Sequence, residues 1–384
     1  MRVLICPDKF AGTLSAPEVA AAVIAGWHDT APGDQAIARP LADGGPGFVE
    51  VLANAVAGRR LAVPTVDPLG RPAQGEILVT DPDAAGGVPT AYVESAQACG
   101  LHLLTEDERD PKTTTSYGLG LLIAAAVESG ARRVVIGLGG SATNDAGAGL
   151  LAALGAAPID ELGHALPYGG AALGTASALA GAPRLREVEL VAATDVDNPL
   201  TGLHGASNVY GPQKGASRED VFLLDSALEV FAGVLERELP TCPPDLATLP
   251  GAGAAGGLGA AILALGGRCE SGIALVTDMI GLAAALDEAD LVITGEGSFD
   301  HQSLRGKVVA GIAGAARDRG LPCVVLAGRV STGRREAAAA GVTEAYSLVD
   351  HFGGEEHGGV EQAMTRPAEG LRAVSARLAG QWSR

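Results

Sequence analysis

Five short apolar segments recur along the chain, and each leads into a loop of small and polar residues. They are "RVLICPDKFAG", "RRVVIGLGGSATND", "VELVAATDVDNP", "ADLVITGEGSFD" and "LPCVVLAGRVS". Continuous runs of Val, Ile and Leu are typical of strands that are covered on both faces of a parallel sheet. We therefore expect five buried strands whose carboxyl ends open into polar loops.

Helical patterns lie between these segments. In "LSAPEVAAAVIAGWH", Ser15 and Glu18 have the spacing of a capping box ahead of an apolar run with helical periodicity. A second helix is predicted in "SYGLGLLIAAAVESG", where Gly130 is suited to end it. Alternating strands and helices predict an α/β fold with a parallel sheet.

The middle of the chain differs from its ends. Residues 157–183 are poorly periodic and residues 238–250 are rich in proline, while the total of 384 residues is long enough for two or three domains. We predict a Rossmann- or flavodoxin-like domain built from residues 1–70 and 285–384. An inserted α/β domain is predicted at residues 71–284.

Polar residues gather where the predicted strands end. In open α/β folds, ligands bind outside the carboxyl ends of the strands, so these positions are the first candidates for chemistry. They are Asp8, Lys9, Ser141, Asp145, Asp195, Asp197, Glu296 and Asp300.

The loop "GLGGSATND" has two interpretations. Its glycines could form a tight structural turn, or the amides of Gly139, Gly140 and Ser141 could bind an anion at a helix start. Asp145 is suited to cap the helix that follows. The pattern alone does not separate the two interpretations.

Two further loops carry acidic side chains. Asp195 and Asp197 in "TDVDNP" point the same way along an extended chain, which suits a metal ion or a base, whereas the alternative is an Asp/Asn-Pro turn. "TGEGSFDHQSLRGK" concentrates acid and base after a buried strand, with an ordinary polar loop as the alternative. Its candidates are Glu296, Asp300, Arg305 and Lys307. The segment "GPQKGAS", in which Lys214 lies between glycines, indicates a surface turn.

Charge and cysteine content narrow the classes of partner and site that this chain can have. With 27 basic and 45 acidic residues, the net charge is −18, which excludes nucleic acid and anionic membranes as partners. The five cysteines are scattered, without the C-x-x-C spacing of a zinc site, and are expected to fill the core. No signal-peptide pattern opens the chain, so we expect a soluble cytoplasmic protein.

Glycine-rich nucleotide motifs are missing or out of place. No Walker A sequence occurs, and the G-x-G-x-x-G at Gly251, Gly253 and Gly256 follows "PDLATLP" rather than a strand. We interpret it as a flexible loop at a helix start. The remaining inventory of loop amides, cations and carboxylates is the one that phosphoryl transfer needs.

Eight segments in order resemble the bacterial glycerate kinase type-1 family, from about residue 3 to about residue 350. They are "PDKFAGTLSAPEVA", "PLADGGPGFVE", "RDPKTTTSYGLG", "GLGGSATNDAGAGLLAALGA", "DVDNPLTGLHGAS", "YGPQKGAS", "GAGAAGGLGAA" and "VITGEGSFDHQSLRGK". The resemblance implies that ATP phosphorylates D-glycerate, usually to 2-phosphoglycerate, with Mg²⁺. It also implies two α/β domains, and it leaves open whether identical chains assemble into a homo-oligomer.

The resemblance also implies roles for the loop residues. The implied catalytic residues are Asp195, Lys9, Asp300 and Lys307. The implied substrate and phosphate ligands are Asp43, Arg71, Gly139, Gly140, Ser141, Asn144, Lys214 and Arg305. The implied Mg²⁺ ligands are Asp195, Asp197 and Glu296, with Asp195 either a metal ligand or the general base.

Two departures from the family pattern affect these roles. The family commonly reads "ADGGEGT" where this chain has Pro46 and Phe48 in place of Glu and Thr. The family's first loop often reads "PDSFK", and here Lys9 replaces the Ser and Ala11 the Lys. Alternative functions are a kinase for another small hydroxy or sugar acid, and a non-catalytic sensor of glycerate or nucleotide.

Overall fold

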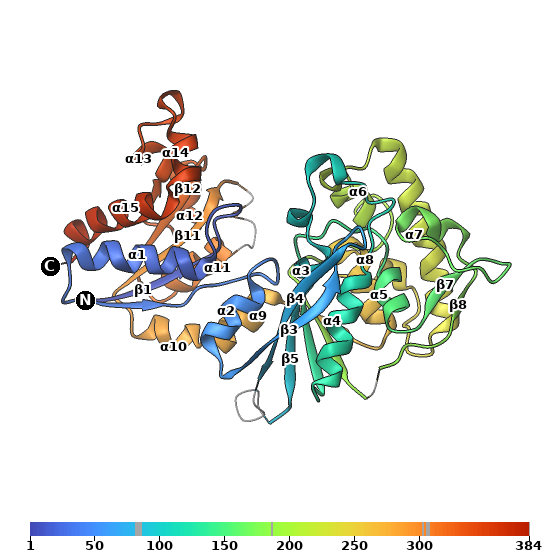
Figure 1. The fold of residues 1–384 in the computed structure, drawn as a ribbon. Helices are drawn as coiled ribbons and strands as arrows, with labels where there is room; N and C mark the ends of the chain where they lie inside the picture. Colours follow the sequence, from blue (N-terminus) through green and yellow to red (C-terminus); the bar gives the residue numbers. More distant parts are fainter. Residues whose placement is uncertain (81–86, 186, 302, 305–307, 384) are drawn as a thin grey trace. The chain divides into compact units, whose positions relative to one another are not determined.

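The computed structural model describes residues 1–80, 87–185, 187–301, 303–304 and 308–383 (Figure 1). The chain divides into two compact units. One comprises residues 1–42, 50–55 and 276–384, and the other comprises residues 43–49 and 56–275. We call them the terminal unit and the middle unit. The predicted domain boundaries, at residues 70 and 285, remain predictions.

The terminal unit contains a five-stranded parallel sheet in the order β13-β12-β11-β1-β2. Its strands are β1 (Arg2–Pro7), β2 (Gln35–Ala38), β11 (Leu291–Phe299), β12 (Cys323–Val330) and β13 (Glu344–Ser347). Three of the five predicted strands are found here. The expected parallel sheet made from both chain ends is therefore confirmed.

Strand β1 lies at a change of direction in this sheet. The chain runs from β1 to β2 on one side, while β11 pairs with the other side of β1 and leads on to β12 and β13. Ligands of doubly wound folds bind at such a switch point, outside the carboxyl ends of the strands. In this unit, that point lies where β1 and β11 end.

Strand β11 is longer than its apolar run predicts. The sequence "LVIT" predicts a strand that ends at Thr294, with Glu296 in the following loop. Instead, β11 continues to Phe299, because Ser298 and Phe299 pair with Arg329 and Val330 of β12. Glu296 is therefore a strand residue.

Helices α1 (Ala16–Thr30) and α15 (Pro367–Trp382) lie side by side against the parallel sheet (Figure 1). The amide of Ser15 donates to Glu18 at 2.8 Å, as the capping box predicts. The hydroxyl of Ser375 donates to the carbonyl of Val23, which joins the two helices. Their shared apolar side chains and those of the strands form one core, including Val3, Ile5, Val19, Trp27, Leu371 and Val374.

The other helices of the terminal unit are shorter. They are α10 (Leu282–Asp287), α11 (Val308–Arg317), α12 (Arg334–Ala339), α13 (Leu348–His351) and α14 (Gly359–Thr365). Two more helices, α2 (Phe48–Ala55) and α9 (Gly272–Met279), each contain a boundary between the units.

The middle unit contains a mixed six-stranded sheet in the order β10-β9-β6-β5-β4-β3. Its strands are β3 (Gly58–Val66), β4 (Pro72–Thr80), β5 (Thr90–Glu94), β6 (Arg133–Gly137), β9 (Glu189–Ala193) and β10 (Arg268–Glu270). The four strands from β5 to β10 are parallel, while β3 and β4 are antiparallel additions. The other two predicted strands are β6 and β9.

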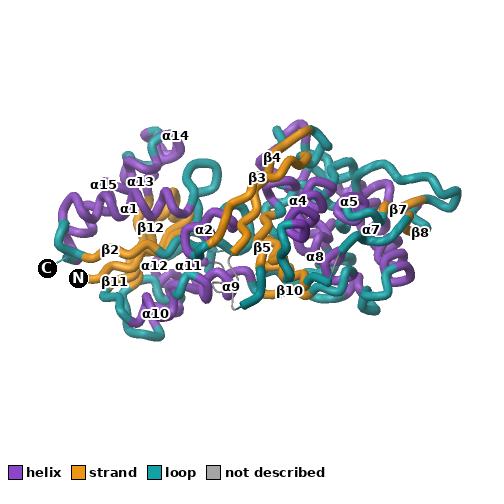
Figure 2. Tube along the Cα trace, turned by 60° about the horizontal axis from the view of Figure 1, so that its bottom comes forward, coloured by secondary structure: helices purple, strands orange, loops and turns teal. Residues whose placement is uncertain are grey.

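Helices and one small hairpin complete the middle unit. Helix α4 (Tyr117–Glu128) ends as predicted, with Gly130 in the left-handed region at φ +94°. The hairpin of β7 (Ala157–Ile159) and β8 (Ala178–Ala180) lies beside helix α7 (Arg218–Glu238) (Figure 2). The remaining helices are α3 (Ala96–Cys99), α5 (Ala148–Ala153), α6 (Ala206–Tyr210) and α8 (Ala254–Ala264).

Three of the five cysteines are buried, in agreement with the prediction that cysteines fill the core. All five cysteines are free thiols, and Cys6, Cys99 and Cys323 are buried in the cores as expected. In the part of the chain that the structure describes, no helix combines the length and the apolar character needed to cross a membrane.

Candidate active site

Four parallel strands of the middle unit end in one row. Glu94 pairs with Gly137, Gly137 with Ala193, and Ala193 with Glu270. The residues that follow these strands therefore emerge at the same edge of the sheet. We call this the carboxyl edge of the middle unit, and it carries most of the candidate residues.

Asp195 lies at this edge, two residues after β9. Its Oδ1 accepts a hydrogen bond from the hydroxyl of Ser271 at 2.5 Å, and its Oδ2 accepts one from the amide of Ile273 at 3.0 Å. Ser271 in turn accepts from the amide of Ala274 and caps helix α9. The carboxylate is thus held at a helix start while its side chain stays exposed to solvent.

Opposing influences act on the pKa of Asp195. Desolvation raises it above the usual carboxyl value, and the negative charge of Asp43 raises it further. The hydrogen bonds from Ser271 and from the amides of Ile273 and Gly272 act in the opposite direction. The net shift is upward, which makes the carboxylate a stronger base than an ordinary aspartate.

Residues 43–46 lie directly on the carboxyl edge. A Cβ at Gly139 would stand 2.7 Å from the Cα of Gly45, and one at Gly140 would stand 2.9 Å from the Pro46 ring. These glycines are needed because another stretch of backbone packs against them. Packing alone therefore explains why both positions hold glycine.

The amides of this loop remain available for an anion. Among the described residues, the backbone amides of Gly139, Gly140 and Ser141 donate to no protein acceptor. Gly140 is exposed, with φ at +64°. A structural turn and an anion site are therefore compatible here, and binding of phosphate by these amides remains a prediction.

Glu94, which the sequence analysis did not single out, organises the segment after residue 43. Its Oε2 accepts from the amides of Gly47 at 3.0 Å and Val49 at 3.3 Å, at the start of α2. Phe48 is buried between Gly137 and the ring of Tyr92. The signal that could have revealed Glu94 is the apolar strand "TAYVE", which ends in this acid.

A cavity of about 310 Å³ opens beside Asp195. It is lined by Asp197, in the loop after β9, and by Cys269 and Glu270, at the end of β10. Ser271 also lines it, and the pattern "ESGIALV" could have revealed this residue as a helix cap. In the described part of the chain, no three His, Cys, Asp or Glu residues form a metal-binding group.

Lys214 is buried, which contradicts the predicted surface turn. Its side chain is only 2% exposed, and its Nζ donates to the Ser141 hydroxyl at 2.9 Å and to the Thr143 carbonyl at 2.6 Å. Burial lowers the pKa of Lys214 to about 7, although the charge of Asp145 opposes the shift. Its ammonium is directed at the loop after β6.

Asp145 and Asn144 support this loop from within the protein. Asp145 is fully buried and accepts from the amides of Gly147 and Gly149, so it caps the start of α5 as predicted. It also accepts from the amide and hydroxyl of Ser116. The Nδ2 of Asn144 donates to Ser207, which leaves this predicted ligand buried.

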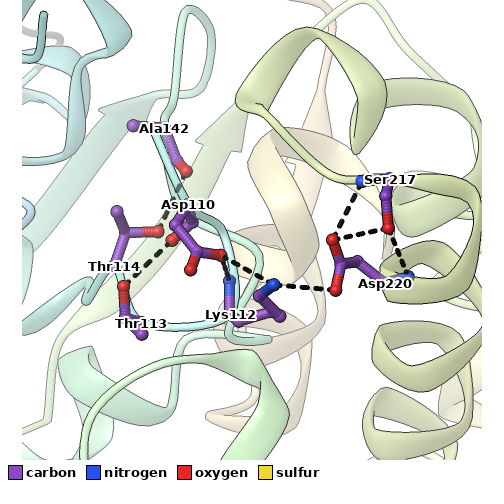
Figure 3. A network of polar contacts seen from close by, with 7 residues as sticks. All are labelled: Asp110, Lys112, Thr113, Thr114, Ala142, Ser217 and Asp220. Carbon is purple, nitrogen blue, oxygen red and sulfur yellow. Dashed lines mark hydrogen bonds and ion pairs between the residues drawn. The ribbon is translucent and has the colours of Figure 1, made fainter. Parts of the chain in front are cut away.

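The segment "RDPKTTTS" is tied to the same loop by the polar network in Figure 3. Thr114 donates to the carbonyl of Ala142 at 3.0 Å, and Lys112 reaches Asp220 at 2.8 Å. Asp220 also accepts from Ser217 at the start of α7. This segment therefore connects the glycine loop to the longest helix of the described chain.

Arg71 stands apart from these contacts, in the turn between β3 and β4. Its guanidinium lies 2.5 Å from Asp67 and 2.6 Å from Glu108. The two carboxylates raise the pKa of Arg71 and balance its charge. A role for Arg71 in substrate binding remains a prediction.

The glycine-rich segment 251–259 is packed, not flexible. It spans the start of helix α8, and no strand comes directly before it, as expected. A Cβ at Gly253 would stand 2.1 Å from the Pro199 carbonyl, and one at Gly256 would stand 1.9 Å from the Thr143 carbonyl. The interpretation as a flexible loop is therefore wrong, because these glycines lie against other backbone segments.

In the terminal unit, the remaining candidates follow β1 and lie on or after β11. The Nζ of Lys9 lies 3.6 Å from Asp8, and Glu296 lies on β11. Asp300 forms a turn in which its Oδ1 accepts from the amide of Ser303. Arg305 and Lys307 lie outside the described residues.

Comparisons with known proteins agree with this arrangement. The model of the glycerate kinase family matches residues 3–383.

The chain belongs to the glycerate kinase family.

It is therefore a phosphotransferase. Membership of this family supports glycerate kinase activity, with glycerate and ATP as the substrates. Glycerate 2-kinase of Escherichia coli K12 is 40% identical over 357 residues, covering 92% of each chain. Glycerate kinase of Bacillus subtilis 168 is 40% identical over 353 residues, covering 91% of this chain and 90% of the relative. A crystal structure assigned to glycerate kinase 2 of Salmonella typhimurium LT2 has a TM-score of 0.79 at 38% identity, covering 99% of this chain and 98% of that one.

Proposed function

We propose that the enzyme transfers the γ-phosphoryl group of ATP in line to the C2 hydroxyl of D-glycerate, giving 2-phosphoglycerate. The choice of C2 is supported by the 40% identity to the relative named glycerate 2-kinase. The observation that carries the mechanism is the Asp195 carboxylate, held by Ser271 and by the start of α9 beside an open cavity.

Asp195 is the general base in this proposal. Its oxygens accept hydrogen bonds from Ser271 and from the amides at the start of α9, and a carboxylate has about four acceptor sites, so one is left for the hydroxyl of glycerate. Its pKa lies above that of an ordinary aspartate, so it accepts the hydroxyl proton more readily as the new O–P bond forms. Ser271 and helix α9 fix the direction in which the carboxylate faces.

The anionic groups of the substrates bind to amides and cations. The unengaged amides of Gly139, Gly140 and Ser141 suit a phosphate or carboxylate, and Asp43 suits a substrate hydroxyl at the same edge. In the terminal unit, Lys9 and Asp300 are proposed at the ends of β1 and β11. Arg71, Asn144, Lys214, Arg305 and Lys307 remain proposed contributors.

Mg²⁺ fits the donors at the carboxyl edge. Asp195 and Asp197 both line one cavity, and Mg²⁺ binds through one or two carboxylates together with waters and substrate phosphates. Asp197 is the residue we assign to it in the middle unit, with Glu296 proposed in the terminal unit. When bound, the ion neutralises charge on the phosphates.

Removing divalent metal is expected to abolish turnover, and Mg²⁺ is expected to restore it. In Asp197→Asn, the Mg²⁺ concentration that gives half-maximal activity should rise at least about tenfold, because a charged oxygen ligand is lost. The measurement is a Mg²⁺ titration of the initial rate. Asp287→Asn, which alters an exposed carboxylate paired with Arg319, is the control and should titrate like the unaltered enzyme.

The product identifies the attacking hydroxyl. Purified enzyme with ATP, Mg²⁺ and D-glycerate is coupled to enolase, with and without phosphoglycerate mutase. We expect signal without the mutase, since enolase consumes 2-phosphoglycerate directly. Signal only with the mutase would move the transfer to the C3 hydroxyl, and no signal in either assay would contradict the proposed function.

A further inference from the structure

Lys214 is held in a fixed position against the loop that follows β6. Its ammonium donates to the Ser141 hydroxyl and to the Thr143 carbonyl, and its side chain is almost fully buried. The next residue, Gly215, has φ at +99°, and a Cβ there would stand 2.1 Å from the Arg109 carbonyl. The backbone therefore fixes where this lysine enters the protein.

The hydrogen bond from Lys214 sets the direction of the Ser141 hydroxyl. Because Ser141 Oγ accepts from the ammonium, its own hydrogen points elsewhere, and among the described residues it meets no acceptor. The amides of Gly139 and Gly140 lie beside it in the chain and are also unengaged. The hydroxyl is thus available to donate to an oxygen of a bound anion.

We propose that Lys214 is a positioning residue that acts on the anionic substrate through Ser141, by holding the Ser141 hydroxyl as a donor. This rests on the proposed function, in which the loop of residues 139–141 binds a phosphate or carboxylate. Lys214 itself does not touch the substrate. This indirect role replaces the direct phosphate contact that the family resemblance implies for this lysine.

The protonation state of Lys214 decides which way the hydroxyl points. Burial disfavours the charged ammonium and brings the pKa of Lys214 to about 7, while the charge of Asp145 opposes this shift. The other titratable group near the ammonium is Cys99, whose burial raises the pKa of its thiol so far that it stays neutral. A neutral amine has a lone pair and accepts the Ser141 hydrogen, which turns that hydrogen away from the substrate. Anion binding therefore weakens as the pH rises through neutrality.

The test compares kcat/KM for both substrates from mildly acidic to alkaline buffers in the full-length enzyme and its variants. From mildly acidic to alkaline pH, kcat/KM of the unaltered enzyme should fall about tenfold, which is the effect of losing one hydrogen bond to a charged group. In Lys214→Met and in Ser141→Ala this loss should disappear, leaving the lower level of activity with only the pH dependence that ATP itself contributes. The double variant should be no worse than Ser141→Ala.

The matched control is Lys112→Met, which removes an ammonium paired with Asp220. It should keep the full decline with pH. Because the phosphates of ATP also titrate near neutrality, the readout is the difference between variants at each pH. If Lys214→Met does not fold, Ser141→Ala still decides the outcome, because it leaves Lys214 in place.

Three results would overturn the proposal. A decline that persists in Ser141→Ala would place the titration elsewhere, and multiplied losses in the double variant would make the two residues independent. Ser141→Ala with unaltered kcat/KM in acid would show that Ser141 does not meet the substrate. If the unaltered enzyme phosphorylates glycerate in the same assay, these failures concern Lys214 and Ser141 and leave the proposed reaction standing.

Discussion

Asp195→Asn is expected to lower kcat by about 10²- to 10⁴-fold, with little change in KM for either substrate. An amide cannot take the hydroxyl proton, whereas it can keep the local contacts of the carboxylate. Its oxygen can accept from the Ile273 amide, and its nitrogen can donate to Ser271, so helix α9 stays capped. Steady-state kinetics with a thermal unfolding curve measure both effects.

Two results would limit the role of Asp195. Near-normal turnover in Asp195→Asn would end its assignment as the base and leave it as a cap for α9. A loss that excess Mg²⁺ restores would make it a metal ligand instead. Asp287→Asn serves as the matched control and should retain normal turnover, since its carboxylate is largely exposed.

Gly256→Ala is expected to lower the free energy of unfolding by at least about 3 kcal/mol, or to prevent folding. Gly256 has φ at +74°, a region that costs alanine about 1 kcal/mol or more, and the added methyl would stand 1.9 Å from the Thr143 carbonyl. That carbonyl belongs to the loop that Lys214 holds. Urea denaturation followed by circular dichroism measures the change.

The control is Gly233→Ala on helix α7. No atom lies within 4 Å of a Cβ at this position, and the glycine is inside a regular helix. Alanine should therefore raise the free energy of unfolding by about 0.5–1 kcal/mol. Equal effects of the two substitutions would contradict the packing described for segment 251–259.

Continuous apolar runs made the strands predictable. Each of the five runs became a parallel strand because the burial of a two-sided sheet requires local hydrophobicity, which the sequence shows directly. The position of Asp195 after β9 follows from the same pattern. Its contacts with Ser271 and Ile273 could not be predicted, since they join residues 76 and 78 positions apart.

The environment of Lys214 shows why local patterns fail elsewhere. The glycines and polar residues of "GPQKGAS" are those of a surface turn, and nothing nearby in the sequence indicates burial. Its hydrogen-bond partners lie 73 and 71 positions away, and only the fold brings them together. The packing of residues 43–46 against Gly139 and Gly140 could not be predicted for the same reason, because these segments are far apart in the sequence.

The pairing of β1 with β11 has a consequence for biosynthesis. Val3 lies opposite Leu291, so β1 leaves the ribosome long before its partner β11 exists. Closing so long a loop is slow, and although β2 can pair with one edge of β1 soon after synthesis, a strand whose other edge stays unpaired is prone to aggregate. Residues 43–49 and 56–275 contain the whole sheet of the middle unit, and all of them are synthesised before β11. The sheet of the terminal unit is therefore completed only after β11 has been synthesised, and until then one edge of β1 has no partner strand.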